Sequence, residues 1–233
     1  MRGPSLDDPR TRPHNRAALE RVGQPGSRLL LPTPALVCDL DALEANLAAM
    51  ADLARGAGVA LRPHAKTHKS LAIARRQLDH GAAGIAVAKL SEAEALAPGL
   101  ADAGTPTSIL VTSPVAGETA ARRVAALARV CDLAVVVDRP SAVDNLAADI
   151  DTTVTVLCDV DVRLGRSGVR SPADALDVAR RVANCARLRF GGVQGYAGHL
   201  QHIADPAGAN RRLHAGAIER VDHVDEWDQR LAQ

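Results

Sequence analysis

The stretch Leu133-Ala-Val-Val-Val-Asp-Arg-Pro140 contains the unit from which this chain is built. An apolar run is followed by two charged residues and then by a proline, which is well tolerated in the first turn of a helix. The same order, a strand-like run and then a capped or proline-punctuated helix, recurs at Val59–Leu61, Ile85–Val87, Ser108–Val111, Leu133–Val137, Val154–Leu157 and Leu188–Val193. These runs are apolar on both faces, which is typical of parallel strands covered by helices. The pattern predicts an α/β protein, either a doubly wound sheet or a TIM-type barrel.

Polar residues follow the carboxyl end of every run, and this favours the barrel, in which the chemistry collects at that end of several strands. They are His64 and Lys66; Lys89 and Ser91; Thr112 and Ser113; Asp138 and Arg139; Asp159, Asp161, Arg163 and Arg166; Tyr196, His199, Gln201 and His202. A dinucleotide-binding sheet would need a glycine-rich first turn and an acid on the second strand, and the sequence has neither.

Composition excludes several classes of function. The 28 Lys and Arg residues nearly balance the 27 Asp and Glu residues, and aromatics make up only 1% of the chain, so nucleic acid is not an expected partner. No apolar run reaches the roughly 20 residues of a membrane helix, and the N-terminus lacks a secretory signal. The four cysteines are isolated in apolar surroundings, so we interpret them as small buried hydrophobes in a reducing, cytoplasmic protein.

The chain divides into two regions by composition. Residues 1–27 are rich in Arg, Pro, Gly and Asp without hydrophobic periodicity, which predicts a flexible leader. Residues 28–233 are expected to form a partial barrel. Near its start, Asp39 or Asp41 is expected to cap a helix that carries Leu43 and Leu47 on one face.

The octet Arg62-Pro-His-Ala-Lys-Thr-His-Lys69 is the strongest candidate for chemistry. A lysine crowded by other cations has a lowered pKa, and only the neutral amine attacks an aldehyde to form a Schiff base. The alternative is a solvated basic turn that opens a helix and holds an anion. A metal bound by His64 and His68 is disfavoured, because no HExxH pattern accompanies their spacing.

Three segments together resemble the start of D-threonine aldolase and D-serine dehydratase-like enzymes, of the alanine racemase-like group of pyridoxal-phosphate proteins. They are Thr33–Asn46, the octet Arg62–Lys69, and Gly84–Glu94. The resemblance extends from about Leu31 to Gln201 and implies an alanine racemase N-terminal-domain-like (β/α) barrel that binds pyridoxal phosphate. By position in the motif, Lys66 would hold the cofactor as a Schiff base, and His64 would contact its ring or phosphate.

Two later segments match the same family. Cys158–Gly168 resembles its fifth-strand segment, in which Arg166 matches an arginine near the cofactor ring; a surface arginine in a glycine-rich loop is the alternative. Gly191–Gln201 resembles the sixth-strand end, where Tyr196 would point toward the cofactor; a buried tyrosine with a satisfied hydroxyl is the alternative. His199 and His202 remain candidate acid–base groups without an assigned role.

The resemblance implies a pyridoxal-phosphate-dependent lyase acting on D-configured β-hydroxy amino acids, either as an aldolase or as a dehydratase. Lys66 and Tyr196 would be its catalytic residues, and Lys66, His64, Arg166 and Tyr196 its cofactor-binding residues. Such relatives use a divalent metal, Mn or Zn, held by a His-x-Cys/Asp pair of a C-terminal β domain. The resemblance also leaves a homodimer open.

Only part of that arrangement has a counterpart here. About six of the eight barrel strands are recognisable, a helical tail is expected over Ala207–Gln233, and we expect neither the metal ligands nor the β domain within the sequence. The expected protein is therefore a truncated barrel whose own activity is open. The alternatives are a non-catalytic pyridoxal-phosphate carrier and an unrelated barrel enzyme that binds a phosphate ligand without a Schiff base.

Overall fold

The computed structural model describes residues 21, 23–31, 33–101, 108–200 and 203–204. The chain separates into two compact units, Met1–Ala57 and Gly58–Gln233. The predicted leader, residues 1–27, and the predicted tail over 207–233 lie largely or wholly outside the described residues. Both therefore stay predictions.

The first unit contains a short 3₁₀ helix, η1 (Ser27–Leu30), and a long helix, α2 (Leu40–Gly56). Asp39 is the N-cap of α2, and its side chain accepts a hydrogen bond from the backbone N–H of Ala42. This confirms the first of the two capping residues that the sequence suggested. The cap satisfies one of the backbone donors that every helix leaves unpaired in its first turn.

The second unit is built around a parallel sheet of five strands in the order β1-β2-β3-β4-β5, the same as their order in the chain. The strands are β1 (Ile85–Val87), β2 (Ser108–Val111), β3 (Asp132–Val137), β4 (Val154–Val160) and β5 (Leu188–Gly195). Doubly wound sheets reverse their strand order at a switch point, whereas barrels add each strand beside the last. The observed order is that of a barrel segment, as predicted.

One predicted strand takes a different form. Val59–Leu61 is not a strand; instead His64, just after it, forms an isolated parallel bridge with Ala86 of β1. The N–H of Ala65 donates to the carbonyl of Ala86, and the N–H of Ala86 donates to the carbonyl of Pro63, both at 2.8 Å. Because Pro63 has no N–H of its own, it cannot extend the ladder, and the pairing stays short.

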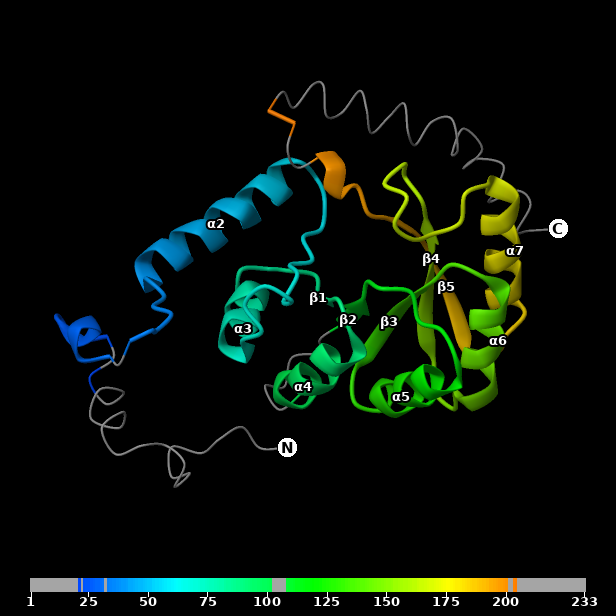
Figure 1. Cartoon of the computed structure of the whole chain (residues 1–233), viewed down its shortest axis with the longest axis horizontal. Coiled ribbons are helices and arrows are strands. Elements are labelled where there is room, and N and C mark those ends of the chain that lie inside the picture. The colour runs from blue at the N-terminus through cyan, green and yellow to red at the C-terminus, as the bar shows by residue number, and fades with distance from the viewer. Residues whose placement is uncertain (1–20, 22, 32, 102–107, 201–202, 205–233) are drawn as a thin grey trace. The chain divides into compact units, whose positions relative to one another are not determined.

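One helix precedes each of the five strands, and neighbouring helices pack side by side along the sheet (Figure 1). They are α3 (Leu71–Asp79), α4 (Leu90–Ala101), α5 (Glu118–Ala128), α6 (Pro140–Asp149) and α7 (Pro172–Ala183). Pro140 and Pro172 each stand in the first turn, where the absent N–H removes no helical hydrogen bond. No described helix has the length and apolarity needed to cross a membrane.

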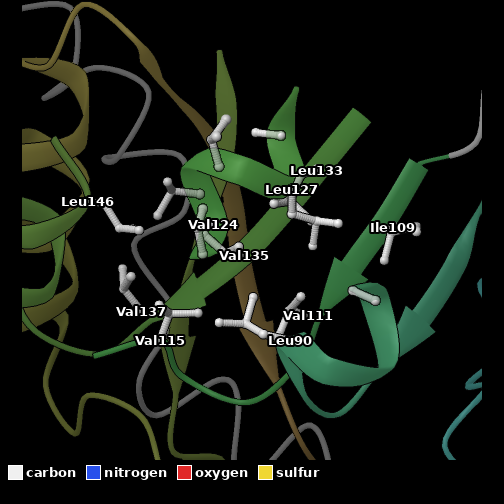
Figure 2. Packing of buried hydrophobic residues seen from close by; sticks show 14 of the residues in the cluster. Leu90, Ile109, Val111, Val115, Val124, Leu127, Leu133, Val135, Val137 and Leu146 are labelled. Carbon is white, nitrogen blue, oxygen red and sulfur yellow. The ribbon is translucent and has the colours of Figure 1, made fainter. Parts of the chain in front are cut away.

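The hydrophobic core lies between the sheet and these helices. Leu133, Val135 and Val137 of β3 all belong to it, together with Val124 of α5 and Leu146 of α6 (Figure 2). Each of these five residues is fully buried. Ala134 and Val136 alternate with the core residues of β3, so they point to the opposite face, and they are buried as well. This burial on both faces explains the unbroken apolar runs in the sequence.

Two glycines shape the sheet. Gly84, just before β1, lies so close to neighbouring segments that a Cβ there would stand 2.2 Å from Nη1 of Arg62 and 2.4 Å from the carbonyl oxygen of Ser108. The same Arg62 nitrogen donates to that carbonyl at 3.0 Å and to the Ser108 hydroxyl at 3.2 Å. Gly192, with φ of 107°, lies where the β4–β5 register shifts: Val156 pairs with Phe190, but Cys158 pairs with Val193. β5 therefore carries one extra residue, a β-bulge.

Candidate functional site

A pocket of about 200 Å³ opens at the carboxyl ends of the strands. Segments far apart in the sequence form it: the turn after the His64 bridge, the residues that follow β1 and β2, the loop after β4, and the end of β5. Its lining consists of His64, Lys66, Ala88, Thr112, Ser113, Pro114, Arg166, Ser167, Gln194, Gly195 and Tyr196. The location is the one that barrel enzymes use for their active sites.

All four predicted site residues, His64, Lys66, Arg166 and Tyr196, line this one pocket. The Nζ atom of Lys66 lies 5.9 Å from the centre of the Tyr196 ring, and Cζ of Arg166 lies 5.2 Å from it. Both distances are within the range of cation–π attraction. Tyr196 thus joins two cations that are 100 residues apart in sequence (166 − 66).

Tyr196 owes its place to the glycine two residues later. A Cβ on Gly198 would lie 2.4 Å from the Tyr196 hydroxyl oxygen and 2.5 Å from the adjoining ring carbon. Only a residue without a side chain lets the ring lie there. Tyr196 is 40% exposed, so the alternative of a buried tyrosine is wrong.

His64 is held as a neutral imidazole. Its Nδ1 accepts from the backbone N–H of Lys66 at 3.3 Å, and its Nε2 lies 3.2 Å from Oγ1 of Thr112. The Thr112 hydroxyl donates its own proton to the carbonyl of Val87 at 3.0 Å, so it can only accept from the ring. We therefore assign the tautomer with the proton on Nε2. Burial lowers the pKa of His64, and the nearby charge of Lys66 lowers it further.

Behind the lining lies a buried carboxylate, Asp159, which is 2% exposed. The Ser167 hydroxyl donates to its Oδ2 at 2.7 Å, and Nε2 of Gln194 donates to its Oδ1 at 3.2 Å. Burial raises the pKa of Asp159, and the two hydrogen bonds oppose that rise.

The sequence drew attention to Asp159 as a polar residue at a strand end but gave it no role. It assigned nothing to Gln194 or Ser167, both of which line the pocket. The available signal for Gln194 was its position directly after the predicted strand run Leu188–Val193, at the carboxyl end where the polar residues of a barrel site collect.

Other candidates lie elsewhere. His199, in the 3₁₀ helix η2 (Gly198–Leu200), is exposed and does not line the pocket. Gln201 and His202 lie outside the described residues. Lys69 and Lys89 are exposed and also absent from the lining. Within the described part of the chain, no three His, Cys, Asp or Glu side chains gather closely enough to hold a metal ion.

The donors of the pocket suit an anionic aldehyde. Lys66 offers a primary amine, Arg166 offers a guanidinium fork for an anionic oxygen, and the hydroxyls of Ser113 and Ser167 lie on the same lining. The residues present therefore fit pyridoxal phosphate, which carries an aldehyde, a phenolate and a phosphate.

Comparison with known proteins gives the ancestry. The family described as "Alanine racemase, N-terminal domain" matches residues 38–226. The chain belongs to this family. The resemblance inferred from the three sequence segments is confirmed, and the alanine racemase N-terminal family depends on pyridoxal phosphate.

Its relatives include enzymes of D-amino acids. The chain is 40% identical over 190 residues to D-threonine aldolase of Arthrobacter sp, covering 79% of this chain and 48% of that protein. It is 34% identical over 201 residues to D-threo-3-hydroxyaspartate dehydratase of Delftia sp. (strain HT23), covering 83% of this chain and 52% of that protein. The crystal structure of D-threonine aldolase from Filomicrobium marinum superposes with a TM-score of 0.74 at 37% identity, over 84% of this chain and 54% of that one. The chain thus spans about half the length of these relatives.

Proposed function

We propose that this chain binds pyridoxal phosphate through Lys66 and forms the cofactor-binding part of a lyase acting on D-configured β-hydroxy amino acids, of the D-threonine aldolase or dehydratase type. The observation that carries the proposal is the meeting of Lys66, Arg166 and Tyr196 in one pocket at the carboxyl ends of the strands. The relatives named D-threonine aldolase and D-threo-3-hydroxyaspartate dehydratase supply the substrate class.

Each side chain has a distinct task. The Lys66 amine would hold the cofactor by condensing with its aldehyde, the carbonyl oxygen leaving as water. Arg166 donates hydrogen bonds to an anionic oxygen in a fixed fork that lysine could not reproduce. When bound, pyridoxal phosphate supplies an electron sink for the substrate.

His64 orients the site and does not transfer a proton. Its Nδ1 accepts a hydrogen bond from the backbone N–H of Lys66, and its Nε2 donates to the hydroxyl oxygen of Thr112. An imidazole with both nitrogens engaged adds no charge and fixes the backbone of Lys66. Tyr196, which lines the pocket beside both cations and is 40% exposed, is the group that we expect to exchange a proton with the ligand.

The attachment is tested by reducing the cofactor-loaded chain with borohydride and locating the labelled peptide by mass spectrometry. We expect the label on Lys66 and its loss in Lys66→Ala. Lys69→Ala is the matched control, because Lys69 is an exposed lysine three residues away that does not line the pocket. A label on another lysine, or an undiminished label in Lys66→Ala, contradicts the proposal.

The reaction is tested by supplying D-threonine or D-serine with Mn²⁺ or Zn²⁺ to the loaded chain. Glycine and an aldehyde would identify an aldolase, and a keto acid would identify a dehydratase. Labelling of Lys66 without any product would instead favour the pyridoxal-phosphate carrier, and would reject the lyase activity of this chain.

A further inference from the structure

Asp159 makes two hydrogen bonds beneath the pocket without reaching it. It lies near the end of β4, is almost fully buried, and is absent from the pocket lining. Each carboxylate oxygen accepts one hydrogen bond, from Ser167 and from Gln194 respectively. Both donors line the pocket, so Asp159 touches the residues around the ligand and not the ligand space itself.

The β-bulge at Gly192 creates the contact with Gln194. If the register between Val156 and Phe190 continued unchanged, Asp159 would pair with Val193. Because β5 contains one extra residue, Asp159 pairs with Gln194 instead. Bulges commonly re-aim a side chain next to a functional site, and here the bulge places an amide within hydrogen-bond distance of the carboxylate.

Gln194 extends the connection to a third strand. Its Nε2 also donates to the backbone carbonyl of Thr112 at 3.1 Å. An amide nitrogen carries two hydrogens, so both bonds form at once. Asp159 therefore ties together the ends of β2, β4 and β5 and the loop after β4.

The hydrogen bonds of Asp159 hold residues that are close in sequence to two pocket residues. Ser167 directly follows Arg166, and Gln194 stands two residues before Tyr196. We propose that Asp159 is a positioning residue that fixes Arg166 and Tyr196 against each other through Ser167 and Gln194. This inference rests on the proposed function for its cofactor, but its geometric part concerns the free chain alone.

The physical reason is that Asp159 gives the Ser167 hydroxyl and the Gln194 amide a hydrogen-bond partner that is itself buried and therefore fixed in place. Removing the carboxylate takes this partner away from the Ser167 hydroxyl and from one amide hydrogen of Gln194, both of which are partly buried at the pocket. Both then re-orient, and the arginine and the tyrosine beside them move with the backbone. Supporting residues of this kind control how well a site is pre-formed.

Tyr196 makes the test independent of the cofactor, because it is the chain's only tyrosine. Protein labelled with ¹³C on the tyrosine ring gives NMR signals from this residue alone. In the cofactor-free chain, Asp159→Ala should shift or broaden these signals. Asp159→Asn should restore them, since its amide accepts from Gln194 and donates to the oxygen of Ser167. Thr155→Val is the control: it removes the two hydrogen bonds that Arg189 of β5 donates to Thr155 of β4, at the opposite end of the strands.

The same variants are then titrated with pyridoxal phosphate. Asp159→Ala should weaken the affinity on the order of tenfold and alter the visible circular dichroism of the bound chromophore, with Asp159→Asn and Thr155→Val close to the unmodified chain. Unchanged tyrosine signals in Asp159→Ala would overturn the inference, as would an equal change in Thr155→Val or a failure of Asp159→Asn to restore them. If the signals behave as expected but Lys66 takes no label in the unmodified chain, the proposed function fails and the positioning role stands.

Discussion

His64 and His68 are expected to make the stability of the second unit depend on pH. Burial lowers the pKa of both imidazoles below the ordinary value of 6.5. The unfolded chain therefore takes up protons at a higher pH than the folded chain. The stability that these groups contribute is present above the ordinary pKa and is lost as the pH falls through the lowered folded values.

We predict that the free energy of unfolding decreases as the pH is lowered from neutrality to about 5, measured by urea titration. His64→Asn should reduce that slope, because the amide does not titrate. His199→Asn, at an exposed position outside the pocket, is the control and should leave the slope unchanged. Equal slopes for the unmodified chain and His64→Asn would contradict the prediction.

Residue roles were only partly readable from the sequence. The motifs identified His64, Lys66, Arg166 and Tyr196, and these residues do share one pocket. Their roles stay predictions. The hydrogen bonds of Asp159 to Ser167 and Gln194 could not be predicted, because the bond to Gln194 depends on a register shift between β4 and β5 that no local sequence pattern indicates. The expectation of four buried cysteines holds only for Cys158: Cys38 is exposed, and Cys131 and Cys185 are partly exposed.

At the scale of elements, helix α7 offers a clean test of local signals. Its N-cap Ser171 accepts from the backbone N–H of Asp174 at 3.1 Å, and its hydroxyl donates to the Asp174 carboxylate at 2.7 Å. Ser171→Ala should lower the free energy of unfolding by ~1 kcal/mol. Since this cap does not line the pocket, the affinity for pyridoxal phosphate should stay the same.

Ser171→Thr is the matched variant, because threonine keeps the hydroxyl and should retain most of the stability. The readout is the urea midpoint together with the slope of the transition. An alanine variant as stable as the unmodified chain would show that water replaces the cap at no cost.

Elements were the most predictable level of this structure. Five of the six strand runs form strands at or near the expected bounds, since an apolar run between a helix end and a polar turn has few alternatives in a parallel sheet. The exception, Val59–Leu61, has the right composition but is followed by Pro63. A single missing donor was enough to reduce a strand to a bridge.

At the scale of the whole molecule, the reactivity of the cysteine thiols can be used to follow unfolding. Cys38 is exposed, whereas Cys158 is fully buried and burial raises the pKa of its thiol to about 12. Burial also raises the pKa of Cys131 to about 11. Since the thiolate is the reactive form, Cys158 is protected both by burial and by its raised pKa, whereas the partly buried Cys131 is protected mainly by its raised pKa.

With a disulfide reagent near pH 8 (roughly the pKa of a free thiol), Cys38 should react first, and Cys158 should react only when the second unit unfolds. Cys38→Ser should abolish the fast phase and leave the slowest phase unchanged. Labelled peptides identify each site. Rapid modification of Cys158 in the folded chain would contradict the buried position of β4.

The strand order could be anticipated because polar residues at the ends of successive runs indicated a barrel, and β1 to β5 follow that order. The joining of distant segments into one pocket follows from it: parallel strands bring their carboxyl ends to one edge, whatever their separation in sequence. The division of the chain near Ala57 was not foreseen, because α2 has the same helical pattern as the helices of the second unit.

The close approach at Gly84 carries a genetic implication. Arg62 and Ser108 occupy the space that any side chain at this position would need, and the backbone φ of 153° is one that other residues rarely adopt. Codon 84 should therefore tolerate only synonymous changes in a saturation library selected for soluble expression, and even the smallest replacement, alanine, should be depleted.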